Sequence, residues 1–401
     1  MSWEKVRLGD VTDSCLGKML DKAKNKGEYQ PYLANVDVRW GSFNLDNLSE
    51  MRFEDNEQER YGLKYGDLVI CEGGEPGRCA IWKDQIPNMK IQKALHRVRV
   101  HDCLDYRFLY YWFLLAGKTG ALEQYFTGAT IKHMPGEKLR SVLIDMPPIE
   151  VQRHIANILW VYDDLIENNQ KQIKLLEEAA QRLYKEWFVD LRFPGHETTP
   201  IVNGVPEGWR VDRADSFFDM SIGKTPPRAE KQWFTDGTTG TPWVSISDMG
   251  SSGVYVFHTS EGLTEDAISK HNIKVVSADT VLLSFKLTVG RVSITTGNSC
   301  TNEAIAHFII KDSTLREYVY LYLKCFEYDS LGNTSSISKA VNSKIVKGMP
   351  FIVPDTTVLS QFHQMSRPIF DEIKNRQKVN INLVEARDRL LPKLMSGEIK
   401  V

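Results

Sequence analysis

The chain has 401 residues, of which 42% are hydrophobic and 25% are charged, and its formal net charge is −2. This composition is ordinary for a globular protein of two or three domains. It excludes a generally basic protein that coats nucleic acid, but not DNA binding by a local patch, because the field that matters is that of the docking face. If the chain binds DNA, we expect a basic partner chain to share the phosphate contacts.

The first half begins with short predicted strands between polar turns, followed by one buried helix over 105–115. The strands span 32–38, 67–71, 78–82 and 94–100. The most apolar run, 108–116, is about half as long as a membrane-spanning helix. The cysteines show no zinc spacing, and Met1–Lys5 contains no apolar signal core. We therefore expect a cytoplasmic protein without membrane contact and with buried, inert cysteines.

A long helix follows the first globular part. From Ile155 the apolar residues step by four and three, which is the heptad pattern of helices that pair. The seam consists of Ile155, Leu159, Tyr162, Ile166, Asn169, Ile173, Leu176, Ala180, Leu183 and Trp187. At 1.5 Å per residue the helix measures roughly 55–60 Å, so one small domain cannot bury the whole stripe.

The second half repeats this order. Its predicted strands and helix span 243–247, 280–285, 291–295, 304–310 and 315–326. Trp3 recurs as Trp209, 206 positions later, and Leu176 recurs as Leu383, 207 positions later. A repeat of this length is too long for a solenoid unit and predicts a pseudo-two-fold molecule with two similar surfaces. Such surfaces suit a two-part target, of which duplex DNA is one.

Adding 207 to the first seam gives a second, weaker seam. Its members are Phe362, Ser366, Ile369, Ile373, Arg376, Asn380, Leu383, Arg387, Leu390 and Leu394. Pro368 predicts that this helix starts or kinks there, because proline is best tolerated in a first helical turn. The economical arrangement is an antiparallel pair in which Asn169 fixes the register. The alternative is two unrelated surface helices, each packed on its own domain.

Several short strings, distributed over both halves, carry a resemblance to a known family. They are 3–11 (WEKVRLGDV), 208–211 (GWRV), 222–226 (IGKTP), 241–249 (TPWVSISDM), 130–132 (TIK), 147–152 (PPIEVQ) and 175–188 (LLEEAAQRLYKEWF). By these strings the chain resembles, over nearly its whole length, the specificity subunits of type I restriction–modification systems.

The resemblance implies an α+β (α/β) fold in which two mixed target recognition domains are separated by two long antiparallel coiled-coil helices. The corresponding parts are 1–148 for the first recognition domain, 149–193 for the central spacer helix, 194–206 for a linker, 207–355 for the second recognition domain and 356–401 for the C-terminal spacer helix. Each domain would read one half of a split DNA sequence, and the helices would act as a ruler.

The resemblance also implies partners. Two modification subunits, which bind S-adenosylmethionine and methylate adenine, would dock on the helices. Restriction subunits, which use ATP and Mg²⁺ to translocate and cleave DNA, would join the same assembly. These cofactors are expected on the partner subunits and not on this chain.

Catalytic motifs fail on inspection. Residues 223–225 (GKT) have the tail of a phosphate-binding loop, but Phe218 stands where that loop requires glycine. Residues 145–149 (DMPPI) are only superficially similar to the Asp-Pro-Pro-Tyr motif of adenine methyltransferases. The histidines and cysteines form no metal-ligand pairs. We therefore expect a chain without catalytic or metal-binding residues.

Residues that read DNA should lie in loops and carry forked or amide side chains for base edges, or Lys, Arg, Ser and Thr for phosphates. In the first half the candidates are Lys22, Lys24, Arg39, Glu72, Glu75, Arg78, Thr130, Lys132 and His133. In the second half they are Lys224, Thr225, Arg228, Ser284, Lys286, Arg291, Ser336, Ser338 and Lys339. The plain alternative is a set of turns with solvated charges. Because 72–78 has no near match in 284–291, two different half-sites and an asymmetric target are expected.

Two further classes of function stay open. A coiled-coil adaptor whose domains bind proteins, without DNA specificity, fits the heptad seam and the acidic balance. An enzyme with an unrecognised site is the weaker alternative, because the expected motifs are missing.

Overall fold

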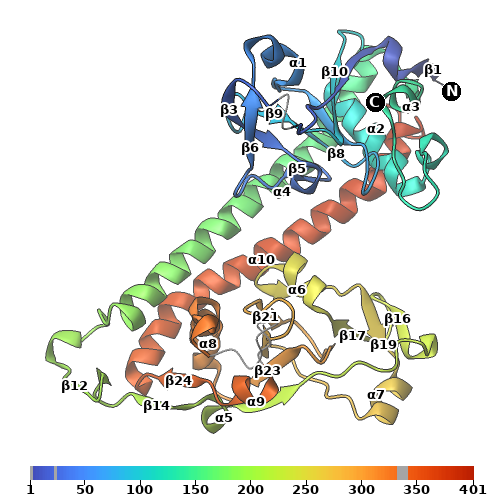
Figure 1. Ribbon diagram of the computed structural model, residues 1–401. Coiled ribbons are helices and arrows are strands. Elements are labelled where there is room, and N and C mark those ends of the chain that lie inside the picture. The colour runs from blue at the N-terminus through green and yellow to red at the C-terminus, as the bar shows by residue number, and fades with distance from the viewer. Residues whose placement is uncertain (1–2, 22–24, 332–341) are drawn as a thin grey trace. The chain divides into compact units, whose positions relative to one another are not determined.

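The protein is described by a computed structural model, which covers residues 3–21, 25–331 and 342–401 (Figure 1). It forms two compact units, Met1–Ile166 with Asn382–Val401, and Glu167–Ile381. Each unit combines a lobe of sheets and short helices with parts of the two long helices, α4 (Ile149–Tyr184) and α10 (Thr356–Met395). The predicted α+β repeat is confirmed.

The main sheet of the first lobe is antiparallel, with the order β2-β10-β7-β8. The strands of this lobe are β1 (Glu4–Arg7), β2 (Thr12–Leu16), β3 (Glu28–Leu33), β4 (Val38–Arg39), β5 (Ser42–Phe43), β6 (Glu50–Phe53), β7 (Leu68–Cys71), β8 (Cys79–Ile81), β9 (Lys90–Ile91), β10 (Leu95–Val100) and β11 (Leu143–Met146). A second sheet has the order β6-β3-β9, and β1 pairs with β11. The helices of this lobe are α1 (Gln58–Tyr61), α2 (Tyr106–Thr119) and α3 (Gly136–Arg140).

The main sheet of the second lobe has the order β15-β23-β20-β21-β18. The strands after α4 are β12 (Ile201–Val202), β13 (Val205–Pro206), β14 (Arg210–Arg213), β15 (Asp219–Ile222), β16 (Phe234–Asp236), β17 (Thr241–Val244), β18 (Tyr255–Val256), β19 (Glu261–Leu263), β20 (Val281–Ser284), β21 (Val292–Thr295), β22 (Cys300–Thr301), β23 (Ile305–Ile309) and β24 (Pro350–Val353). The helices are α5 (Ala214–Phe217), α6 (Ile246–Ser252), α7 (Glu265–His271), α8 (Arg316–Cys325) and α9 (Ser343–Lys347).

The two lobes share one topology. The order β2-β10-β7-β8 recurs as β15-β23-β20-β21, and β1–β11 recurs as β14–β24. The parallel pair β3–β9, which is flanked by β6, recurs as the parallel pair β17–β22, which is flanked by β19. The sequence repeat is therefore a repeat of the sheet topology, to which the second lobe adds β16 beside β19 and the parallel strand β18 at the edge of its main sheet.

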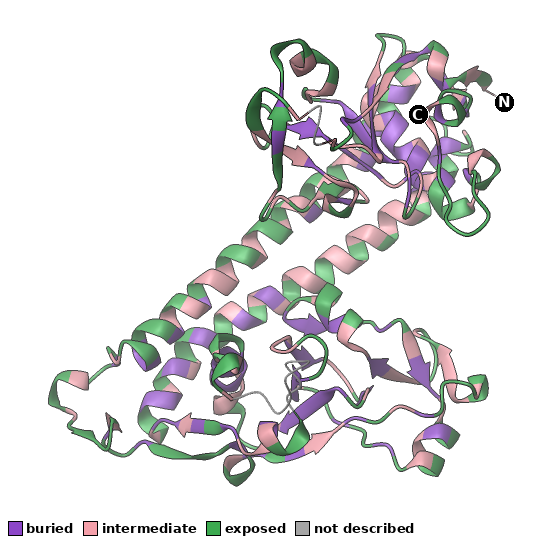
Figure 2. Ribbon diagram, in the orientation of Figure 1, coloured by how far each residue is buried: buried purple, intermediate pink, exposed green. Residues whose placement is uncertain are grey.

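The core of each lobe consists of the central strands of the main sheet and one helix, α2 in the first lobe and α8 in the second (Figure 2). In the first lobe the run Phe108–Ala116 lies inside α2, as predicted, because Asp105 caps the helix by accepting from the backbone NH groups of Arg107 and Phe108. Gly120, at φ 72°, ends the helix in the left-handed conformation that glycine adopts without strain.

Two predicted strands were placed too late in the chain. The prediction for 32–38 becomes β3, which ends at Leu33, and the prediction for 243–247 becomes β17, which ends at Val244. In the second case the sequence contains a helix-capping residue that marks the end of the strand, and the prediction overlooked it. Ser245 is a helix N-cap, since its hydroxyl accepts from the backbone NH of Asp248, and α6 begins directly after it.

In the first unit the N-terminal part of α4 lies against the C-terminal part of α10. Ile155 and Leu159 share a buried cluster with Leu391. Further along, Asp163 forms an ion pair with Arg387 and accepts a hydrogen bond from the hydroxyl of Tyr111 over 2.6 Å. Because higher numbers in α4 meet lower numbers in α10, the two segments are antiparallel.

In the second unit the C-terminal part of α4 lies against the N-terminal part of α10. Asn169 donates to the side-chain oxygen of Asn380 over 2.9 Å and accepts from Arg376 over 3.0 Å. Near the other end of this contact the rings of Trp187 and Phe362 are 5.7 Å apart. The pair is again antiparallel, and polar residues predicted to weaken the second seam bind the polar residue of the first.

Of the two alternatives predicted for Pro368, a start or a kink of the second helix, the start is wrong. The helix α10 begins at Thr356 and continues through Pro368 as one element. The proline removes one backbone hydrogen bond, but Phe362, Phe370 and Ile373 are buried in the core of the second unit and hold the flanking turns. Tertiary burial therefore overrides the local preference of proline.

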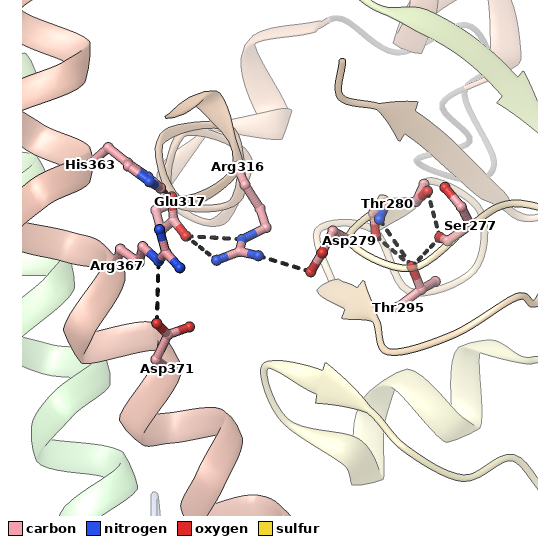
Figure 3. A network of polar contacts seen from close by, with 9 residues as sticks. All are labelled: Ser277, Asp279, Thr280, Thr295, Arg316, Glu317, His363, Arg367 and Asp371. Atoms are coloured by element: carbon pink, nitrogen blue, oxygen red, sulfur yellow. Dashed lines mark hydrogen bonds and ion pairs between the residues drawn. The ribbon is translucent and has the colours of Figure 1, made fainter. Parts of the chain in front are cut away.

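A buried ionic network joins α8 to α10 within the second unit (Figure 3). Glu317 is fully buried and accepts from the guanidinium of Arg316 over 2.9 Å and from the ring of His363 over 2.7 Å. Arg316 also forms an ion pair with Asp279 over 2.9 Å. A buried carboxylate is tolerated because both of its oxygens are paired.

The cysteine prediction holds in part. Cys71, Cys79 and Cys300 are buried and burial raises their thiol pKa values, but Cys103 and Cys325 are exposed. Within the described ranges, no helix combines the length and apolar character needed to cross a membrane.

His307 provides a test of the second core. It is fully buried in β23, where its ring nitrogens lie 2.8 Å from the hydroxyl of Ser221 and 2.7 Å from that of Thr301. Burial lowers its pKa from 6.5 to about 4, so the folded protein keeps the ring neutral where the unfolded chain protonates it. The contribution of His307 to the free energy of unfolding is therefore fully present above pH 6.5 and falls by about 3 kcal/mol as the pH drops to about 4.

We expect His307→Gln to flatten this dependence. The measurement is the urea midpoint of both proteins at several pH values between these limits. Since the slopes are compared, a lower baseline stability of the variant does not affect the result, and equal slopes would contradict the assignment.

Candidate nucleic-acid interface

Two hairpin loops have the same backbone geometry in the two lobes. Hairpin loop 1 (residues 72–77) joins β7 to β8, and hairpin loop 2 (residues 285–290) joins β20 to β21. In each, the backbone NH of the residue before the loop donates to the carbonyl of the arginine after it, over 2.8 Å and 2.9 Å. The last loop residue, Gly77 or Gly290, donates back over 3.0 Å and has φ 90° or 89°.

The side chains on these matching backbones differ almost completely. Hairpin loop 1 reads EGGEPG and hairpin loop 2 reads FKLTVG, so only the closing glycine and the arginine after it are shared. Gly74 and Leu287 occupy the same position and both have positive φ, 73° and 60°. That the two loops read different DNA sequences stays a prediction from the sequence, and the structure shows that their different side chains lie on one backbone scaffold.

The arginines that close the loops, Arg78 and Arg291, make internal contacts. The guanidinium of Arg78 donates to the backbone and side-chain oxygens of Asn35 over 3.2 Å and 3.1 Å, and to Glu75 over 3.0 Å. Arg291 donates to the backbone carbonyl of Ile246 over 2.6 Å. Each arginine thus ties its hairpin to the segment that follows β3 or β17. Contact of these arginines with DNA stays a prediction, beside an observed role in holding the loop.

In the first lobe the loop 127–133 lies beside hairpin loop 1. Thr127 and His133 exchange backbone hydrogen bonds of 2.7 Å and 2.9 Å. The backbone NH of Met134 donates to the backbone carbonyl of Glu72 over 2.7 Å. The side chains of Thr130, Lys132 and His133 are exposed. Two groups of predicted DNA contacts, distant in sequence, are therefore brought to one place.

Glu75 and Arg39 lie near the same loops. The carboxylate of Glu75 accepts from the indole NH of Trp40 over 2.7 Å as well as from Arg78. Arg39 is exposed, and its guanidinium donates to the backbone carbonyls of Val36 and Val38 over 2.6 Å and 2.9 Å. Trp40 therefore packs partly against the core of the lobe and orients an exposed acid of hairpin loop 1.

In the second lobe the segment 224–228 is held by acids that sequence analysis did not single out. Arg228 donates to both carboxylate oxygens of Glu261 over 2.9 Å and 2.7 Å, and it lies 4.5 Å from each of two aromatic ring centres, Phe234 and Trp243. Lys224 donates to the backbone carbonyl of His271 over 2.6 Å.

Glu303 connects this segment to hairpin loop 2. Burial raises the pKa of Glu303, but the hydrogen bond from Thr225, a backbone hydrogen bond and the charges of Lys286 and Arg228 together outweigh burial, and the pKa is lowered. The carboxylate is therefore ionised among three of the predicted contact residues. Lys286 itself is exposed.

Other predicted residues are placed differently. Ser284 is fully buried, and its hydroxyl donates to the carbonyl of Thr288 over 2.6 Å inside the hairpin. Lys18, which begins the basic run around Lys22 and Lys24, is buried and paired with Glu57. Five candidates lie outside the described residues: Lys22, Lys24, Ser336, Ser338 and Lys339.

Sequence reasoning missed Leu287, the apex of hairpin loop 2. Its side chain is 97% exposed. A hydrophobic residue at a hairpin apex gives no signal in the sequence unless the loop is first aligned with its glycine-bearing counterpart. Across the described part of the chain, no three His, Cys, Asp or Glu side chains gather closely enough to hold a metal ion.

The architecture is thus a tandem repeat of one mixed α/β lobe on two long helices. The type I restriction modification DNA specificity domain matches residues 1–178 and again residues 206–374, and the chain belongs to this family of specificity subunits. Specificity subunits are non-catalytic as a family.

Individual relatives agree. The chain is 29% identical to the type I restriction enzyme MjaIX specificity subunit of Methanocaldococcus jannaschii, over 84% of this chain and 78% of the relative. It is 24% identical to the HindI specificity subunit of Haemophilus influenzae, over 99% of both. The crystal structure of an S subunit from M. genitalium has the same fold, with a TM-score of 0.56, 16% identity and coverage of 98% of this chain and 96% of that one.

The role of Arg291 in holding its loop is testable. We expect Arg291→Ala to lower the free energy of unfolding by about 1–3 kcal/mol, because a charge-assisted hydrogen bond to a backbone carbonyl is lost. Lys286→Ala, at an exposed position of the same loop, is the control and should change stability by less than about 0.5 kcal/mol. Urea denaturation of both variants checks this, and equal stabilities would contradict a structural role for Arg291.

Proposed function

We propose that this specificity subunit recognises a bipartite, asymmetric site in double-stranded DNA, and that each lobe reads one half. The observation that supports this best is the pair of hairpin loops, in which the same backbone carries different side chains. A shared framework with different exposed groups is what two readers of two different half-sites require.

The long helices would set the gap between the half-sites and dock two modification subunits. The antiparallel contacts of α4 with α10 within each unit support a ruler, because polar pairs such as Asn169–Asn380 fix the register. Restriction subunits would join through the assembled complex. S-adenosylmethionine, ATP and Mg²⁺ would be bound by these partners. Because the net charge is only −2, we expect tight DNA binding in the complex and weak binding by the chain alone.

The ruler can be tested by inserting one heptad beside Asn169 in α4 and one beside Asn380 in α10. A heptad adds about 10 Å of helix, so the gap should grow by at most about three base pairs while both half-sites stay the same. Mapping of methylated adenines by single-molecule sequencing measures the gap. An insertion in α4 alone is the control, and it should abolish methylation because the register is broken. An unchanged gap in the double insertion would count against the ruler.

The independence of the two readers can be tested by exchange. Replacing residues 1–148 by the corresponding part of another specificity subunit should change one half-site only, since each lobe has its own core. The methylation map is again the measurement. A change in both half-sites would show that the lobes do not read separately.

The second candidate is a protein-binding adaptor, which the exposed outer faces of the long helices favour. It predicts that duplex DNA of any sequence fails to bind the assembled complex. Recognition of DNA predicts binding that depends on sequence and weakens steeply as salt is raised. A titration of the complex at two salt concentrations distinguishes them.

A further inference from the structure

The apex of hairpin loop 2 is an unusual place for a leucine. Leu287 is 97% exposed, the highest value among the large hydrophobic residues that are exposed in the described part of the chain. Its φ of 60° lies in the left-handed region, where the Cβ of an L-residue meets the neighbouring carbonyl. The side chain therefore contributes no buried area to the fold, and its backbone conformation costs free energy.

The other lobe shows that the hairpin does not need leucine here. At the same position hairpin loop 1 has Gly74, at φ 73°, and glycine adopts this conformation without strain. The hydrogen bond across this position is matched, since the backbone NH of Glu75 donates to the carbonyl of Gly73 and that of Thr288 to the carbonyl of Lys286. The NH of the closing arginine differs: that of Arg78 donates to the carbonyl of Glu75, and that of Arg291 to the hydroxyl of Ser284. A strained, exposed leucine in place of a suitable glycine indicates that the side chain has a role outside the fold.

The contrast between the lobes also indicates what Leu287 contacts. Two identical modification subunits would need the same side chains on both lobes, but hairpin loop 1 has no side chain at this position. Two different DNA half-sites would need different side chains. The occupant that fits this asymmetry is DNA.

We propose that Leu287 is a specificity-determining residue that packs against the 5-methyl group of a thymine in the major groove of the half-site read by the second lobe. This inference rests on the proposed function. β20 and β21 are buried within a five-stranded sheet, so only the exposed tip of hairpin loop 2 can enter the groove. The major groove is wide enough for such a tip, and the thymine methyl is the apolar group that its base edges present.

The neighbours of Leu287 suit the same groove. Lys286 and Thr288 flank it in the loop and are exposed. A lysine donates to guanine O6 and N7, and a threonine hydroxyl serves either donors or acceptors. One apolar and two polar side chains at one hairpin tip can therefore distinguish a short run of base pairs that contains thymine.

The test is a thermodynamic cycle between the protein and one methyl group. The full chain is assembled with its modification subunits, and its half-sites are mapped from methylated adenines. The half-site that persists when residues 1–148 are exchanged belongs to the second lobe. Each thymine in it is then replaced singly by deoxyuridine, which keeps the base pair and removes only the methyl group.

We expect one such replacement to weaken binding by about fourfold for the wild-type chain, which corresponds to one buried methyl group. Leu287→Gly should weaken binding of the thymine duplex by about 10- to 100-fold. The same deoxyuridine replacement should have no further effect on the variant, because the contact is already lost.

Stability separates this role from a structural one. Leu287→Gly introduces the residue found at this position in the other lobe. The melting temperature of the variant should therefore be equal to or above that of the wild type, while its affinity for the DNA falls. Val211→Ala, at a residue of β14 that is 53% exposed, is the matched control for loss of an exposed apolar side chain and should bind normally.

Three results would overturn the inference and leave the proposed function intact: a half-site without thymine on either strand, a deoxyuridine effect that persists in Leu287→Gly, or unstacking of a base step, reported by 2-aminopurine fluorescence, without any deoxyuridine effect. The last result would mean that Leu287 inserts between bases. Absence of any sequence preference in the wild-type complex would instead reject the proposed function itself.

Discussion

The structure depends on the burial of two long apolar stripes, one on α4 and one on α10. The sheets alone do not bury either stripe. Within each unit, residues of α4 and α10 also pack against each other in the same hydrophobic cluster. The polar residues in the stripes make this contact specific. A slide by one helical turn would leave Asn169, Arg376 and Arg387 without their partners, and each buried unpaired group costs about 1–3 kcal/mol. Apolar burial supplies the stability of the pair, and the polar contacts select one register.

The same division between framework and variation appears inside the lobes. Gly17 and Gly223 recur at equivalent places because a Cβ at either would lie 2.4 Å or 2.2 Å from a carbonyl oxygen of the neighbouring strand segment, in Gln92 or Asn302. Residues of this kind are retained in both halves because the topology requires them. Residues in the hairpin loops are free to differ because the loop backbone is fixed by its own hydrogen bonds and by the closing arginine.

Sequence alone predicted the repeat, both long helices, the antiparallel pairing and most strands, because these follow from periodicity and from a domain-sized offset. Sequence alone did not predict features that depend on contacts between residues distant in the chain. Nothing local to Arg228 indicates that its guanidinium is held by Glu261 between two rings, and nothing local to Ser284 indicates that its hydroxyl is closed inside the hairpin. The predicted helix start at Pro368 failed for the related reason that buried neighbours outweigh a local preference. Residue type and loop position therefore predicted a set of candidate residues but not which of their side chains are already engaged within the lobe.

Engagement of a side chain does not remove it from recognition, and it can improve recognition. A carboxylate such as that of Glu75, held by Trp40 and Arg78, keeps one orientation and loses little conformational entropy when a cytosine amino group approaches. The orientation of Leu287 is also restricted, but by a different means. Its backbone conformation, and not a side-chain partner, fixes the direction in which the side chain projects. The first lobe thus displays oriented acids on an unstrained, glycine-rich turn, and the second displays a cation and an apolar group on a strained turn. Because the chemistry of these two tips differs and their scaffold does not, the proposed function implies that a change of sequence preference would require substitution at a few apical positions and no change of fold.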